Sequence, residues 1–259
     1  MKLSVLAAAS CAGVLALSAA AQATSLEITI TNNQAAGGLY LTPLFVTAHD
    51  GSFDSFDAGS PADMALEALA EEGDASGVTT NAGANPNGVI TSPGGFAGAP
   101  VIDPGETASI RLHVDPVTNQ YLSFLSMVIP SNDSFIGNDD PMAYQLFDGM
   151  GTFTDIGPIE VYGGDVWDAG TELNDGNGAA FSSAGGTATD ENGVVSLSGS
   201  LDFLLGDPIP TGDPILSVPG ANDLLATITI AAVPLPAGLP LLLVGLGGLG
   251  LAGRRRRKA

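Results

Sequence analysis

Basic residues are almost absent from this chain outside its two ends. Seven Lys and Arg residues stand against 28 Asp and Glu residues. Between Thr24 and Val233 the only basic residue is Arg111, and all the acidic residues lie in that span, so one positive charge against 28 negative ones gives −27. A surface this negative excludes nucleic-acid binding, which needs clustered cations. Two interpretations of the charge remain: a salty habitat that screens self-repulsion, and cation binding by clustered carboxylates.

Cysteine is equally scarce, because the chain has only one and it lies close to the N-terminus. The single cysteine, Cys11, lies in an apolar run that follows Lys2 and ends at the small-x-small sequence of residues 21–23. This pattern predicts a secretory signal peptide over residues 1–23. The chain that remains after its removal has no cysteine. Disulfides, thiolate metal sites and cysteine nucleophiles are therefore excluded from the mature domain.

Catalytic signatures are also missing. The two histidines, His49 and His113, are too few and too far apart in sequence for the usual transition-metal site, and no Gly-x-Ser-x-Gly elbow accompanies them. The sequence pattern places no serine near either histidine. Glu67, Glu71 and Glu72 are interpreted as the polar face and end of a helix. The sequence predicts no catalytic and no cofactor-binding residue, and hence no enzyme.

The pattern between residues 24 and 232 predicts a single all-β domain, an antiparallel β-sandwich of about eight strands with one short helix. Short alternating or apolar runs are separated by Gly-, Pro- and Asn-rich turns, which is typical of sandwiches. Strands are expected in six ranges and in one central apolar run; the six ranges are 26–31, 40–49, 109–114, 159–162, 194–204 and 224–230. Residues 74–105 show little periodicity and are expected to form a long loop.

The one predicted helix begins near residue 60. Ser60 is the expected N-cap, Pro61 suits the first helical position, and Asp63 complements the helix dipole. Met64 and Leu66 begin an apolar stripe. Gly73 is expected to end the helix.

The central stretch runs from Tyr121 to Asp175. Residues 121–129 are apolar on both alternating faces, which predicts a strand buried on both sides, and Pro130 should end it. A turn at 131–134 carries Asp133, and a later loop carries Asp168 and Glu172. If these two loops lie side by side at one end of the sandwich, their oxygens can hold a hard cation such as Ca²⁺.

Asp133, Asp168 and Glu172 are therefore the predicted metal ligands, with Asp139, Asp140 and Asp175 as weaker candidates. A plain turn explains the same residues, because loop aspartates are common in so acidic a chain and Gly170 suits a positive φ. Trp167, the only tryptophan, is expected to pack beneath this loop rather than to stack on a sugar.

These motifs resemble those of a known family. Pro-Ser-Asn-Asp-Ser-Phe at 130–135 and Trp-Asp-Ala-Gly-Thr-Glu at 167–172 look like the paired signature of spondin-type domains in their bacterial form, and Thr-Ala-His-Asp at 47–50 and the segment 56–74 occur in the same order upstream. The resemblance implies a C2-like β-sandwich, a bound calcium ion, and an extracellular adhesion or matrix role without catalysis. Animal members carry disulfides and this chain does not, so their partners are not carried over.

The C-terminal end, residues 233–259, has a different character. Val-Pro-Leu-Pro-Ala at 233–237 precedes an apolar stretch over 239–253 and a basic end at 254–258. The order resembles the sorting signals processed by exosortase-like membrane proteases of Gram-negative bacteria. It implies a transmembrane helix at the inner membrane, with the basic end cytoplasmic. A plain tail anchor is the alternative.

Together these patterns predict an exported, calcium-binding, non-enzymatic domain of the cell envelope, or an extracellular one after C-terminal processing. Its expected role is cell-surface or biofilm-matrix adhesion, with extracellular polysaccharide or surface matrix as the partner. Two alternatives remain open: a secreted glycan-binding module, and a hydrolase with an unrecognised carboxylate site.

Overall fold

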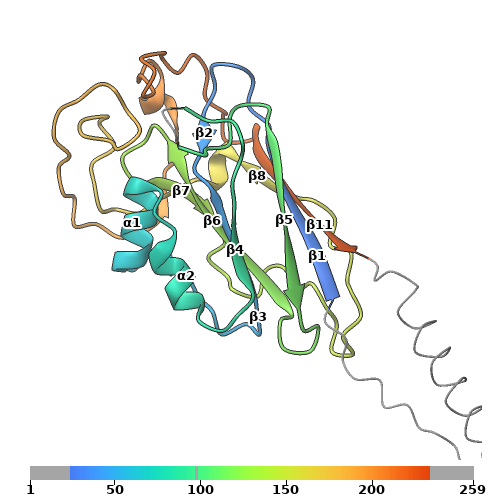
Figure 1. Cartoon of the computed structure of the whole chain (residues 1–259). Coiled ribbons are helices and arrows are strands. Elements are labelled where there is room, and N and C mark those ends of the chain that lie inside the picture. Colours follow the sequence, from blue (N-terminus) through green and yellow to red (C-terminus); the bar gives the residue numbers. More distant parts are fainter. Residues whose placement is uncertain (1–23, 97–98, 234–259) are drawn as a thin grey trace, which may run out of the picture.

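The computed structural model describes residues 24–96 and 99–233, which form two facing antiparallel sheets (Figure 1). The four-stranded sheet has the order β5 (Thr107–Val114), β1 (Thr24–Asn32), β11 (Leu224–Val233), β8 (Ile159–Tyr162). The seven-stranded sheet has the order β10 (Ser196–Leu197), β9 (Trp167–Asp168), β7 (Ser134–Gly137), β6 (Tyr121–Ile129), β3 (Leu44–His49), β4 (Asn87–Ile90), and β2 (Tyr40–Leu41) also pairs with β6. The predicted antiparallel β-sandwich is confirmed.

The main core lies between the two sheets. In β1 every second side chain is buried, with Leu26, Ile28 and Ile30 facing inward and Glu27 and Thr29 half-buried on the outer side. The expected alternation of β5 is also present, since Leu112 and Val114 are buried while Arg111 and His113 are exposed. Every second side chain of these strands is buried because only one face of their sheet is covered.

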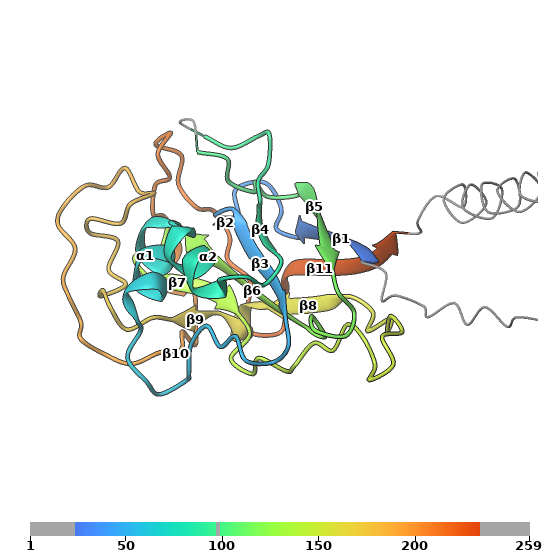
Figure 2. The same cartoon turned by 60° about the horizontal axis from the view of Figure 1, so that its bottom comes forward.

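A second core explains why the central strands are apolar on both faces. Helices α1 (Met64–Glu72) and α2 (Ser76–Ala82) lie over the far side of the seven-stranded sheet (Figures 1 and 2). Leu66 and Leu69 from α1 join Phe45 from β3 and Leu125 from β6 in this second cluster, whereas Phe124 faces the main core. The strand prediction for 121–129 is confirmed, and the strand ends before Pro130.

The helix prediction was right about the end of α1 and wrong about its start. Gly73 ends the helix in the left-handed region, with φ of 68°. Asp63, and not Ser60, is the N-cap, because its Oδ1 accepts from the backbone N–H groups of Ala65 and Leu66 at 3.0 and 2.8 Å. A carboxylate that reaches two free amides at once is a strong cap.

Three other boundaries were also wrong. The expected loop over 74–105 contains α2 and β4, whose short length gives little periodicity. The expected strand over 40–49 is split into β2 and β3 on either side of Pro43, and β3 lies between β6 and β4 in the sheet. Residues 194–204 form only β10 and a 3₁₀ turn, Asp202–Leu204; a further 3₁₀ turn spans Gly163–Asp165.

Both described chain ends leave the domain together. Ser25 pairs with Val233 across β1 and β11, so residue 24 and residue 233 lie side by side at one end of the sandwich (Figure 1). The predicted signal peptide, 1–23, and the predicted transmembrane segment, 239–253, lie outside the described residues. Within residues 24–96 and 99–233, no helix is both long and apolar enough to cross a membrane.

Candidate metal centre

Pairing of two short strands brings the predicted loops together. β7 pairs with β9 so that Ser134 lies opposite Asp168 and Phe135 opposite Trp167. The backbone N–H of Ala169 also donates to the carbonyl of Asp133 at 3.2 Å. Asp133 immediately precedes one strand and Asp168 ends the other, so antiparallel pairing places both carboxylates at the same rim of the sheet.

A single side-chain amide links the two carboxylates. Asn174 donates from its Nδ2 to Asp133 Oδ1 at 2.6 Å and to Asp168 Oδ2 at 3.0 Å. The other oxygen of Asp168 accepts from the backbone N–H of Gly170 at 2.8 Å. Two of the three predicted ligands are therefore adjacent, although they are 35 residues apart in sequence.

The Asp133 carboxylate is completely buried and heavily hydrogen-bonded. Its Oδ2 accepts from the backbone N–H groups of Thr171 and Glu172 at 2.8 and 3.1 Å, and from the Thr171 hydroxyl at 3.2 Å. Asp133 thus holds the loop from residue 170 to residue 174 in place. Its role as a metal ligand remains a prediction.

Asn132, which the sequence suggested only as a turn former, connects Glu172 to the same network. Its Nδ2 donates to Glu172 Oε2 at 3.2 Å and to the carbonyl of Asn177 at 2.9 Å, and its Oδ1 accepts from the N–H of Gly176 at 3.0 Å. Glu172 therefore faces Asn132. The sequence pattern also missed Asn174, and its position two residues after Glu172 was the only available signal.

The weaker candidates are engaged elsewhere. Asp139 accepts from Ala58 N–H, Asp140 from Met142 N–H, and Asp175 from Asn177 N–H and its side-chain amide. Trp167 packs against Phe56, with ring centroids 5.2 Å apart, and donates from its indole nitrogen to the carbonyl of Gly137 at 3.1 Å. The expected packing role of the tryptophan is confirmed.

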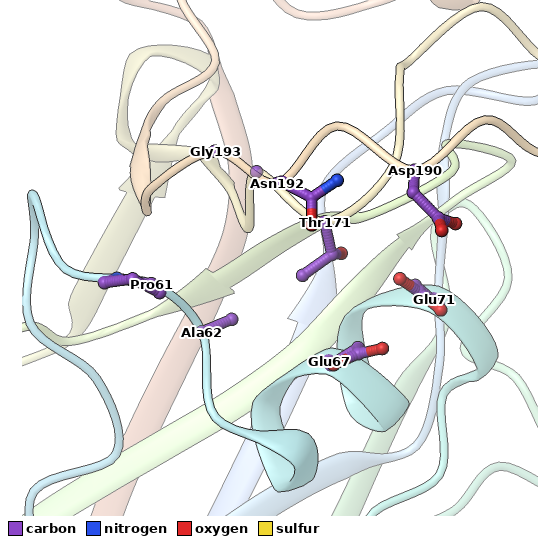
Figure 3. Close-up of a pocket in the computed structure, with 9 residues that line it drawn as sticks. Pro61, Ala62, Glu67, Glu71, Thr171, Asp190, Asn192 and Gly193 are labelled. Carbon is purple, nitrogen blue, oxygen red and sulfur yellow. The ribbon is translucent and has the colours of Figure 1, made fainter.

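An acidic cleft adjoins the loop that follows β9 at Gly170 and Thr171. It has a volume of about 270 Å³ and lies between α1 and the loops at Thr171 and Asp190. Figure 3 shows Glu71 and Asp190 pointing toward one another across it, with Glu67 on the same helix. Glu71 therefore does more than face solvent on a helix, because the fold turns it toward the carboxylate loops.

A comparison with known protein families gives a match over the part of the chain that contains these loops. The family model described as Spondin_N matches residues 35–198, more than half of the chain, and the match contains both carboxylate loops and α1. This chain belongs to the Spondin_N family. Spondin N-terminal domains are of the extracellular, adhesion type, which agrees with an exported protein. No curated protein matches the chain.

In this Spondin_N domain, Asp133, Asp168 and Glu71 lie close enough to affect one another's ionisation, and none of them pairs with a basic residue in the described part of the chain. Burial raises the pKa of Asp133 to about 6, and the adjacent Asp168 adds to the rise, while hydrogen bonds from Glu172, Thr171 and Asn174 oppose it. Partial burial raises the pKa of Glu71 to about 7, with further contributions from Glu172, Glu67 and Asp133. The one ion pair among residues 24–96 and 99–233 is Arg111 with Glu27, at 3.5 Å on the outer face of the four-stranded sheet.

These two shifts predict how stability depends on pH in calcium-free buffer. A carboxyl whose pKa is higher in the folded state than in the unfolded state destabilises the fold as pH rises between the two values. The window runs from the ordinary values, 3.8 for Asp133 and 4.5 for Glu71, to about 6 and about 7. Glu71→Gln removes one of these groups without changing its size. The melting temperature of Glu71→Gln relative to the natural protein should therefore increase between pH 4.5 and 7; a constant difference would contradict the assignment.

The histidines show contacts that the sequence did not predict. His49 Nε2 lies 3.0 Å from Ser123 Oγ, and its Nδ1 accepts from the N–H of Gly51 at 3.0 Å. His113 Nδ1 lies 2.8 Å from Ser25 Oγ. Nothing in the sequence indicated these serines, which strand pairing brings to the two histidines. His49 and Ser123 are 0% and 1% exposed, so this pair is closed to a substrate and gives no support to a hydrolase.

The donors at the centre match calcium in chemical kind. Carboxylate and amide oxygens are hard ligands, and backbone carbonyls lie in the same loops. No Lys or Arg of the described residues pairs with these carboxylates, since Arg111 pairs with Glu27. Within the described part of the chain, however, no three Asp, Glu, His or Cys side chains converge on one point. Asp133, Asp168 and Glu172 would hold the ion only after some of their present hydrogen bonds are exchanged.

Proposed function

We propose that this Spondin_N domain is a non-enzymatic, calcium-binding adhesion module of the cell surface or extracellular matrix. The proposal rests on one observation: the carboxylates of Asp133 and Asp168 accept hydrogen bonds from the same side-chain amide, that of Asn174. The only basic residue between residues 24 and 233, Arg111, pairs with Glu27 on another face. Calcium would neutralise the two carboxylates and join the loops after β6 and β9. Asp133, Asp168 and Glu172 would be its protein ligands.

The proposed partner is extracellular polysaccharide or another surface matrix component. With one arginine against 28 carboxylates between residues 24 and 233, the domain repels most anionic surfaces unless a divalent ion intervenes. A calcium ion held by two or three protein carboxylates has coordination positions left for a partner's oxygens, because Ca²⁺ takes six to eight ligands. This chemistry favours calcium-dependent attachment over turnover of a substrate.

The ends of the chain supply the proposed route to the surface. Residues 1–23 would direct export and residues 233–259 would hold the chain in the inner membrane until an exosortase-like protease acts. The two described ends lie side by side, so both signals connect to the same end of the domain.

Calcium removal tests the metal part of the proposal. The melting temperature of the protein should be higher in CaCl₂ than in EDTA, since a ligand that binds only the native state stabilises it. At a 100-fold excess over Kd the gain is about 2.7 kcal/mol. For a domain of this size that corresponds to a rise of roughly 5–10 °C. Titration calorimetry with CaCl₂ should give one site; equal melting temperatures and no heat of binding would reject the metal site.

Attachment assays test the functional part. Binding of the protein to extracted matrix polysaccharide should occur in CaCl₂ and be lost in EDTA, without release of shorter sugars. A glycan array in EDTA separates this from ordinary glycan binding, because a glycan-binding module that recognises sugar directly would retain its signal there. Release of reducing ends in either buffer would favour the hydrolase alternative.

A further inference from the structure

We propose that Asn174 is a latch, whose amide keeps the two carboxylates of the centre engaged in the calcium-free protein and has to release them for calcium to bind. The inference rests on the proposed calcium site and adds a residue that sets its affinity. The carrying observation is that one nitrogen reaches both carboxylates, Asp133 Oδ1 at 2.6 Å and Asp168 Oδ2 at 3.0 Å. A nitrogen so placed lies where a shared cation would contact the same two oxygens.

Hydrogen bonds to the oxygen and from the nitrogen fix the orientation of the Asn174 amide. Asn174 Oδ1 accepts from the backbone N–H of Asn132 at 3.0 Å and faces that of Asp133 at 3.5 Å, while Nδ2 donates to the two carboxylates. The reversed orientation would place an acceptor against two carboxylate oxygens and a donor against two backbone donors. Hydrogen bonding therefore permits only the observed arrangement.

The latch satisfies hydrogen bonds but leaves the charge uncompensated. An amide is neutral, so Asp133 and Asp168 remain close together with two proton donors between them and no positive charge. The amide thus joins the two loops although no three ligating side chains converge in the described residues. It also makes the amide a competitor, because the same oxygen lone pairs either accept from Asn174 or coordinate the ion.

The Asn174→Asp variant tests whether the amide competes with calcium for the carboxylate oxygens. The substitution keeps an oxygen for the N–H of Asn132, removes both donors to Asp133 and Asp168, and adds a third carboxylate at the same point. We expect at least about tenfold tighter CaCl₂ binding by calorimetry, since ligand charge tunes calcium affinity. The melting temperature in EDTA should fall, because the two carboxylates lose their shared donor.

A matched control lies three residues further along the same loop. The side-chain amide of Asn177 donates to Asp175 Oδ2 at 2.9 Å, and this pair is exposed. Asn177→Asp therefore adds the same charge to the loop without touching the latch. It should change calcium affinity less than threefold, which excludes a general effect of added charge.

The outcomes separate the latch from the calcium site itself. If the natural protein binds CaCl₂ and Asn174→Asp binds no more tightly, the latch is overturned and the proposed site stands. If the natural protein binds no CaCl₂, the proposed site is overturned and the latch with it, whether or not Asn174→Asp binds through its added carboxylate. Should Asn174→Asp not fold, Asn174→Ala decides: a larger calcium-dependent rise in melting temperature than in the natural protein supports the latch, and an equal or smaller one overturns it.

Discussion

Replacing Asp133 with alanine is expected to abolish the calcium-dependent rise in melting temperature and to destabilise the calcium-free protein as well. The substitution removes the acceptor of three partly buried donors, the backbone N–H groups of Thr171 and Glu172 and the amide of Asn174, of which only the amide keeps a second acceptor, Asp168. Each unsatisfied buried donor costs about 1–3 kcal/mol. Removal of an uncompensated buried charge offsets about 3 kcal/mol of this, from a pKa raised from 3.8 to about 6.

The balance predicts a net loss of a few kcal/mol in EDTA, and roughly 5–10 °C in melting temperature for a domain of this size. Melting curves in EDTA and in CaCl₂ measure both parts. Asp139→Ala is the matched control, since Asp139 also accepts one backbone N–H in a nearby loop but does not contact the centre. A full calcium response retained in Asp133→Ala would remove Asp133 from the ligand set.

Truncating Phe135 to alanine should produce the largest loss of stability, about 3–5 kcal/mol. Phe135 is fully buried in the second core and its ring meets that of Phe56 edge-on, with centroids 5.0 Å apart. It also lies opposite Trp167 in the β7–β9 pairing that brings Asp133 and Asp168 together. The cavity left behind should therefore weaken calcium binding in addition to lowering the free energy of unfolding.

Urea unfolding followed by Trp167 fluorescence measures this loss, and calcium titration of the same variant measures the second effect. Phe203→Ala is a suitable control, because Phe203 is 36% exposed and lies in the 3₁₀ turn Asp202–Leu204. Its substitution should cost less than about 1 kcal/mol. A Phe135→Ala variant as stable as this control would mean that the second core contributes little to the fold.

At the proposed site, calcium and protons would compete for the same carboxylates. The raised pKa values of Asp133 and Glu71 mean that the calcium-free fold favours their neutral forms near pH 5. The proposed ion favours the charged forms. Calcium-dependent stabilisation should therefore be weak near pH 4.5 and strong near pH 7, and a matrix held by such domains would loosen on acidification.

The sequence alone determined the class of fold and the loops that matter. Alternating runs such as that in β1 and β5, and the doubly apolar run over Tyr121–Ile129, record directly which faces of a strand are covered. Pro130 restricts its own backbone and Gly73 has unusual backbone freedom, so the strand end and the helix end that they set can be predicted from the local sequence. The two acidic motifs are likewise contiguous in the chain.

Only the tertiary structure decided what those loops contact. The partners of Asp133 lie 38 to 41 residues away, and Glu71 approaches them from a helix that precedes the whole stretch. Asn132 and Asn174 look like ordinary turn residues until strand pairing places their amides against carboxylates. Hydrogen bonds between distant loops depend on register and packing, which leave no periodic trace in the sequence, and for that reason the latch could be recognised only in the folded chain.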